Sequence, residues 1–215
     1  MRAAGRSDRW VVIFSIILAF FLWYVTFIIR PFNFWLTMAF NTILLSAISF
    51  AAGRIPWSGK EWSLRNICIG VLAAIVLYGV FRLGHEILIL ANTYTGIFPR
   101  RAENLNAIYA SRAELPQYII AALLFFPIGF GEEIYWRGFI QRSFQVRWGK
   151  GAAFLLTVIL YTGAHLSTGN PVLILAAFIC GAYWGGLYLY TGSLVPVLIS
   201  HMLWDPFIFV IAPIK

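Results

Sequence analysis

Apolar residues occupy this chain in long blocks that short polar segments separate. The first block runs from Trp10 to Ile29 and ends at Arg30-Pro31, and the second covers residues 34–52. Each has roughly the 20 apolar residues that an α-helix needs to cross the hydrocarbon core of a bilayer. The pattern therefore predicts membrane-spanning helices.

Five further blocks follow. The third begins near Asn66 and continues past Arg82, His85 and Glu86 to Leu90, and the remaining four cover residues 116–140, 151–166, 172–190 and 194–211. We predict an all-α fold, a polytopic transmembrane helical bundle of about seven spans. Residues 1–215 are expected to form a single membrane domain, with N-terminal spans and an interfacial loop in 10–115 and the core helices that carry charged residues in 116–212.

The loop over residues 92–116 has a pattern of its own. Its apolar residues recur at helical spacing among arginines and glutamates, as Phe98, Ala102, Leu105, Tyr109 and Ala113. This spacing predicts a short amphipathic helix that lies in the membrane interface.

Composition agrees with a membrane protein, because 61% of the 215 residues are hydrophobic and 11% are charged, against about 25% charged residues in soluble domains. The net charge is +8, but the basic residues are scattered over short loops, which argues against a nucleic-acid partner and favours a role in topology. An N-terminus in the cytoplasm puts more of them inside (Arg2, Arg6, Arg9, Arg54, Lys60, Arg65, Arg142, Arg147, Lys150) than outside (Arg30, Arg100, Arg101, Arg112, Lys215). We expect a multi-pass protein of the bacterial inner membrane.

Three charged residues interrupt the fourth block, in Gly131-Glu132-Glu133-Ile134-Tyr135-Trp136-Arg137. Charges at membrane depth are costly and usually serve a function. Glu133 and Arg137 are four residues apart with the acid first, which favours an ion pair on one helix face. Glu132 points about 100° away and is left for a proton, a metal or a water. The alternative is that both acids only pair with basic residues on other helices.

Two histidines lie in later blocks. His165 is near the end of the fifth, and His201 is one helical turn before Asp205 in the seventh. At about 1.5 Å per residue, Glu132, His165 and His201 lie roughly 15, 21 and 12 Å from the inner ends of their spans. All three depths fall in the middle of a hydrocarbon core about 30 Å thick. We expect one site to collect these side chains.

Three ordered motifs now stand in separate spans: Glu-Glu-x-x-x-Arg at 132–137, Tyr-x-x-x-His at 161–165 and His-x-x-x-Asp at 201–205. Over residues 116–210 this set resembles the CPBP intramembrane proteases, also called the Abi or CAAX-protease family, which includes the eukaryotic CAAX prenyl endopeptidase. The second motif of that family usually begins with Phe, whereas Tyr161 adds a hydroxyl here. The third motif accepts Asn or Asp.

The resemblance implies a catalytic core in residues 116–212, in which Glu132 and His165 activate water for attack on a peptide carbonyl. It also implies that His201 and Asp205 complete the site and that Glu133 and Arg137 support it. Two chemistries remain open. A zinc ion held by Glu132, His165, His201 and Asp205 would keep a position for water. Alternatively, Glu132 is a general base and His201 with Asp205 forms an oxyanion hole.

The expected function is hydrolysis of a peptide bond in a membrane-anchored protein or peptide. A different reading is a non-catalytic membrane protein that confers bacteriocin immunity or chaperones a partner. A proton-coupled carrier is disfavoured because the sequence has no internal repeat. Haem held between His165 and His201 is a fourth alternative, and a colourless purified protein would exclude it.

Overall fold

The computed structural model describes residues 6–52, 55, 59–96 and 99–214, and all regular elements within these residues are helical. The all-α prediction is therefore confirmed. Four residues used in the sequence argument, Arg2, Arg54, Phe98 and Lys215, lie outside the described part of the chain. The α-helices are α1 (Arg6–Tyr24), α2 (Phe34–Ala51), α3 (Leu64–Thr95), α4 (Arg101–Tyr109), α5 (Gln117–Leu123), α6 (Phe130–Glu133), α7 (Arg142–His165), α8 (Pro171–Thr191) and α9 (Val195–Pro206).

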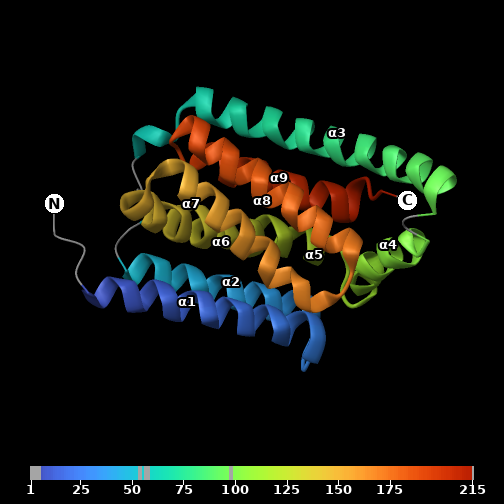
Figure 1. Ribbon diagram of the computed structural model, residues 1–215, viewed down its shortest axis with the longest axis horizontal. Helices are drawn as coiled ribbons and strands as arrows, with labels where there is room; N and C mark the ends of the chain where they lie inside the picture. Colours follow the sequence, from blue (N-terminus) through green and yellow to red (C-terminus); the bar gives the residue numbers. More distant parts are fainter. Residues whose placement is uncertain (1–5, 53–54, 56–58, 97–98, 215) are drawn as a thin grey trace.

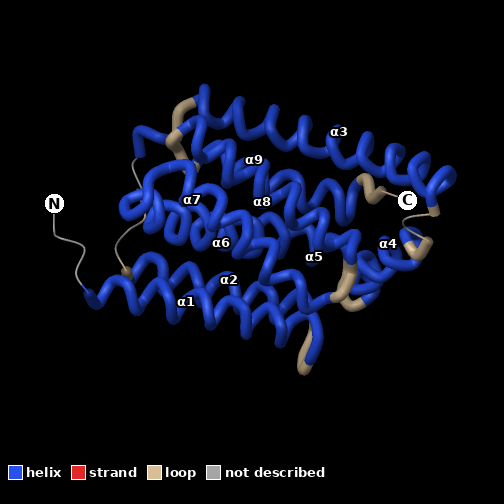
Figure 2. The backbone as a smooth tube through the Cα atoms, in the orientation of Figure 1, coloured by secondary structure: helices blue, strands red, loops and turns tan. Residues whose placement is uncertain are grey.

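Short π- and 3₁₀-helical segments join or extend these helices. They are Val25–Ile29, Gly59–Glu61, Ala110–Ala113, Leu124–Gly129, Ile134–Gln141, Leu166–Thr168 and Phe207–Ile211. Figure 2 shows how little of the described chain remains as loop, and that the loops lie mainly at the two ends of the bundle.

Five helices in the described residues are long and apolar enough to cross a membrane, and the shorter apolar helix Val195–Ile211 follows them. One of the five, Gln117–Thr168, is 52 residues long. Gly149 interrupts it with φ 78° and ψ 171°, a conformation that glycine adopts without steric cost. Because the chain folds back after Gly149, this run contains both spans predicted on either side of it. About seven membrane-crossing segments agree with the structure, and the chain is an integral membrane protein.

The helices run roughly parallel or antiparallel along the long axis of the molecule (Figure 1). In that view α1 and α2 lie along one edge, α3 lies along the opposite edge, and the helices of the C-terminal half fill the space between them. The described chain begins at one end of the bundle and finishes at the other, next to α4. This arrangement agrees with an odd number of spans.

Caps define where several of these helices begin and end. The side chain of Asn33 accepts hydrogen bonds at the start of α2, and Asn170 does the same for α8, which has a proline in its first turn. Gly96 and Gly192 end α3 and α8 in the left-handed conformation. These are the residue types that such positions favour.

The segment with the two glutamates follows a kink. Phe126 is extended, with φ −152° and ψ 127°, since a proline disfavours helical geometry in the residue before it and cannot donate a backbone hydrogen bond. The helix resumes at α6 and continues as the π-helical turn Ile134–Gln141. Gly131 packs closely on α2, where a Cβ would lie 2.9 Å from Cβ of Thr42. The kink and this contact fix how the two glutamates face the bundle.

The amphipathic helix is present as α4, followed by the 3₁₀ turn Ala110–Ala113. It is shorter than the 92–116 pattern suggested, because residues up to Thr95 continue α3. Asn170 donates to the backbone oxygen of Asn104 at 2.8 Å, and the Tyr109 hydroxyl lies 3.3 Å from the backbone oxygen of Ile208. These bonds hold α4 across one end of the bundle.

Candidate active site

Glu133 and Arg137 form the ion pair that their spacing predicted. Nη1 of Arg137 donates to Oε1 of Glu133 at 2.8 Å, and both side chains are fully buried. Nη2 of Arg137 also points at the backbone oxygens of Gly181 and Cys180, at 3.1 and 3.4 Å. The guanidinium therefore ties α6 to α8. These further hydrogen bonds offset part of the cost of burying a charge pair in an apolar interior, while Oε2 of Glu133 and Nε of Arg137 have no hydrogen-bond partner within the part of the chain that the structure describes.

His201 lies between two carboxylates. Its Nδ1 is 2.7 Å from Oε1 of Glu133, and its Nε2 is 3.2 Å from Oδ2 of Asp205. A neutral imidazole carries one N–H and can donate to only one of them, whereas an imidazolium donates to both. The contact with Asp205 confirms the predicted one-turn spacing. The contact with Glu133 was not predicted, so Glu133 does more than neutralise Arg137.

Trp184 supports the same imidazole from α8. Its ring stacks on His201 with centroids 3.6 Å apart and planes 17° apart, and its Nε1 donates to Oγ of Ser200 at 3.1 Å. An aromatic face next to a cationic group is an attractive arrangement. Nothing in the sequence distinguished Trp184 from the other aromatic residues of the apolar blocks.

Glu132 has a hydrogen-bond partner of its own. The residue is 5% exposed, and its Oε2 accepts a hydrogen bond from the hydroxyl of Tyr161 at 3.0 Å. The hydroxyl that distinguishes this chain's second motif thus reaches the first glutamate. The two glutamates have different surroundings, because Glu133 lies in the buried network and Glu132 lines a cavity.

His165 is oriented by its own helix and by α1. Its Nδ1 lies 2.8 Å from the backbone oxygen of Tyr161, which can only accept, so Nδ1 carries the hydrogen. In the neutral ring Nε2 is then the acceptor, and the indole N–H of Trp23 points at it from 3.4 Å. The Phe27 ring packs beside it with centroids 5.8 Å apart. Sequence reasoning did not find Trp23, which lies in an uninterrupted apolar block.

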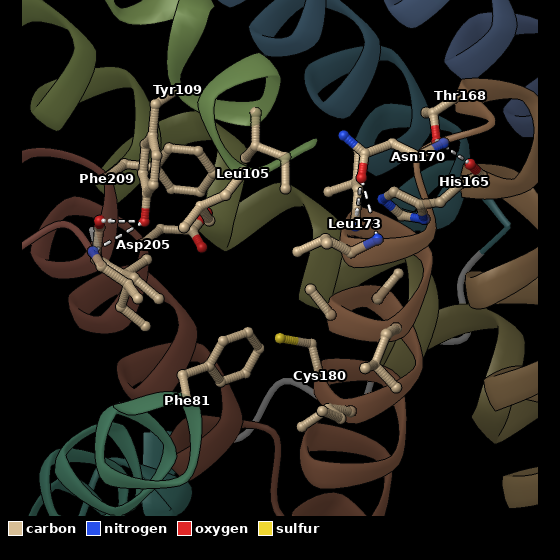
Figure 3. A pocket seen from close by; sticks show the side chains of 18 of the residues that line it. Phe81, Leu105, Tyr109, His165, Thr168, Asn170, Leu173, Cys180, Asp205 and Phe209 are labelled. Atoms are coloured by element: carbon tan, nitrogen blue, oxygen red, sulfur yellow. Dashed lines mark hydrogen bonds between the residues drawn. The ribbon is translucent and has the colours of Figure 1, made fainter. Parts of the chain in front are cut away.

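A cavity of about 490 Å³ brings these groups together. Its mostly apolar wall includes residues of α3, α4 and α8, and the catalytic candidates that reach it are Glu132, His165, His201 and Asp205, together with Tyr161. Glu133 and Arg137 lie behind this wall and do not line it. Figure 3 shows Asp205 and His165 on opposite sides of the cavity, with Leu105 of α4 between them in this view and Phe81 facing Cys180.

The four side chains considered as zinc ligands do not fit a zinc site in this arrangement. The described residues include no group of three or more His, Cys, Asp or Glu side chains that could hold a metal ion. The physical reason is that both ring nitrogens of His201 are directed at carboxylates. A zinc ligand needs a free lone pair on imidazole nitrogen.

Comparison with known families gives one match. Residues 114–207 match the family described as Type II CAAX prenyl endopeptidase Rce1-like. The matched range extends from just before α5 to the end of α9 and contains all six candidate residues. No curated protein and no solved structure matches the chain.

Proposed function

Because the chain belongs, through residues 114–207, to the Rce1-like members of the CPBP family, we propose that it hydrolyses a peptide bond of a membrane-anchored protein or peptide. The family match supports an intramembrane endopeptidase in general. The catalytic roles of individual residues and the class of substrate are the finer parts of this proposal. The observation that carries it is an apolar cavity, lined by Glu132 and His165, inside the membrane-spanning bundle.

Glu132 and His165 activate the attacking water in this proposal. The carboxylate of Glu132 accepts one proton of the water. Nε2 of His165 accepts a hydrogen bond from the other, in place of the long contact from the Trp23 indole N–H at 3.4 Å. The water oxygen attacks the peptide carbonyl carbon. When the C–N bond breaks, the proton on Glu132 passes to the leaving nitrogen. The Nδ1–H of His165, held on a backbone carbonyl at 2.8 Å, leaves Nε2 as the acceptor that this role needs.

His201 is proposed to stabilise the oxyanion that forms on the carbonyl oxygen. With a hydrogen on each ring nitrogen, it donates to Glu133 through Nδ1 and to Asp205 through Nε2. The contact to Asp205 is longer than the contact to Glu133, at 3.2 against 2.7 Å. We therefore assign Nε2–H as the donor that turns to the developing oxyanion. Glu133 and Arg137 hold this imidazole in place from behind the cavity wall.

The substrate class follows from the environment of the cavity. An extended soluble peptide would have to leave water to reach carboxylates surrounded by apolar helices, whereas a membrane-anchored chain is already in the bilayer. We propose that the protein lies in a bacterial inner membrane with its N-terminus in the cytoplasm. The basic residues Arg9, Arg65, Arg142 and Arg147 are all in segments at that end of the bundle.

The test compares the wild-type protein with Glu132→Gln, both purified and reconstituted in liposomes with a library of membrane-anchored peptides. Mass spectrometry of the new termini reports cleavage. Glu86→Gln is a matched control, since Glu86 is exposed on α3 and pairs with Arg82 at 4.0 Å. We expect cleavage by the wild type and the control and none by Glu132→Gln. Cleavage that persists in Glu132→Gln contradicts the role of Glu132 in activating water. In cells, an unchanged biological effect of that variant favours a non-catalytic membrane protein.

A further inference from the structure

Tyr161 contacts both residues to which we assign water activation. Its hydroxyl donates to Oε2 of Glu132 at 3.0 Å, and its backbone oxygen accepts from Nδ1 of His165 at 2.8 Å. Among the described residues, Tyr161 is the one donor of a hydrogen bond to the Glu132 carboxylate. A single residue thus sets the position of the carboxylate and the tautomer of the imidazole.

The Tyr161 ring is itself held on several sides. The Trp136 ring meets it edge-on with centroids 5.4 Å apart, and the guanidinium of Arg137 lies 4.9 Å from its centroid. On the α8 side, a Cβ at Gly181 would lie 3.1 Å from Cδ1 of Tyr161, so the two helices leave no spare room there. The hydroxyl oxygen is therefore fixed by packing and does not depend on its bond to Glu132.

The occupied oxygen of Glu132 has a consequence for catalysis. Oε2 accepts the tyrosine hydroxyl, so Oε1 is the oxygen available to a water in the cavity. A carboxylate free to rotate would present either oxygen, and only some of its orientations would point at a water that also contacts His165. A donor to Oε2 removes that freedom.

We propose that the Tyr161 hydroxyl is a positioning group that holds Oε2 of Glu132 and presents its Oε1 as the base. This inference rests on the proposed function, since it specifies how the same site works. In the step it supports, a water proton moves to Oε1 and the water oxygen bonds to the carbonyl carbon. That proton then goes to the amine nitrogen as the C–N bond breaks. Tyr161 gains and loses no proton.

Tyr161→Phe tests the proposal because it removes one oxygen and preserves the ring. We expect kcat to fall about tenfold, the size of effect that the loss of one hydrogen bond to a charged group produces, with KM little changed. Tyr135→Phe is the matched control, since Tyr135 is also buried and its hydroxyl donates to Oγ of Ser15 at 3.4 Å.

The split between kcat and KM separates this positioning role from a structural one. A purely structural role for Tyr161 predicts a lower yield of folded protein in Tyr161→Phe, with kcat per folded molecule unchanged. If wild type is active and Glu132→Gln is inactive, yet Tyr161→Phe behaves like Tyr135→Phe, the positioning role is wrong and the proposed function stands. If wild type cleaves nothing, the proposed function fails first.

Discussion

Oε1 of Glu133 and Nδ1 of His201 are 2.7 Å apart, and this contact joins α6 to α9 in the buried centre of the protein. The same oxygen also accepts from Arg137 at 2.8 Å. One carboxylate oxygen therefore balances a cation on its own helix and a histidine on another. Since neither partner has access to bulk water, the stability of the site depends on this carboxylate more than on Glu132.

Glu133→Gln should destabilise the protein strongly. The amide keeps the shape but removes the charge, and it leaves the buried Arg137 without its counterion. Breaking a buried pair by removing one charge costs about 3–5 kcal/mol. Thermal unfolding in detergent measures the effect, with Glu132→Gln as the control that should unfold near the wild-type temperature. Equal melting temperatures for the two variants would contradict the division of roles between the glutamates.

Asp205→Asn should keep activity within about tenfold of wild type. The Asn side-chain oxygen can still accept from Nε2–H of His201, and its amide can donate to an oxyanion. Asp205→Ala can neither accept nor donate a hydrogen bond and should lose more activity than Asp205→Asn. Comparing the two variants separates the size of the side chain from its hydrogen bonding. Initial rates of peptide cleavage at saturating substrate provide the comparison. An inactive Asn variant with an active Ala variant would exclude the oxyanion role.

Peptide cleavage should persist after treatment with a strong chelator. The ring nitrogens of His201 are directed at Glu133 and Asp205 at 2.7 and 3.2 Å, and a metal would have to displace one of these carboxylates. Elemental analysis of the purified protein and activity after dialysis against chelator make the test. If activity disappears with the chelator and returns with zinc alone, His201 must give up one of these carboxylate contacts in the active protein.

Local geometry explains which parts of this site could be predicted from sequence. Hydropathy gave the spans because a bilayer sets the length of an apolar helix. The pairs Glu133–Arg137 and His201–Asp205 follow from helix periodicity alone, as both partners lie on one helix and are four residues apart. The 100° separation of Glu132 from Glu133 predicted that Glu132 would point away from the Glu133–Arg137 pair.

Contacts between helices could not be predicted in the same way. Whether His201 meets Glu133 and Trp184 depends on how α6, α8 and α9 are rotated about their axes, and no residue in the chain encodes that angle by itself. The bond from Trp23 to His165 is subject to the same limit, since the two residues are 142 positions apart. Pro127 was visible in the sequence, but its effect on the direction of α6 depends on the packing of Gly131 against α2.

Gly131→Ala should impair both stability and activity, because the added Cβ would lie 2.9 Å from Cβ of Thr42 and 3.0 Å from Oγ of Ser46. Overpacking of this kind typically costs about 1–3 kcal/mol. The helix would move off α2 and carry Glu132 with it.

Gly79→Ala in α3 is the control, since a Cβ there meets nothing within 4 Å, and alanine favours a helix by up to about 1 kcal/mol over glycine. The melting temperature should fall in Gly131→Ala and rise in Gly79→Ala. The cleavage rate should fall only in Gly131→Ala. A Gly131→Ala protein as stable and active as Gly79→Ala would show that the contact between α6 and α2 does not position the site.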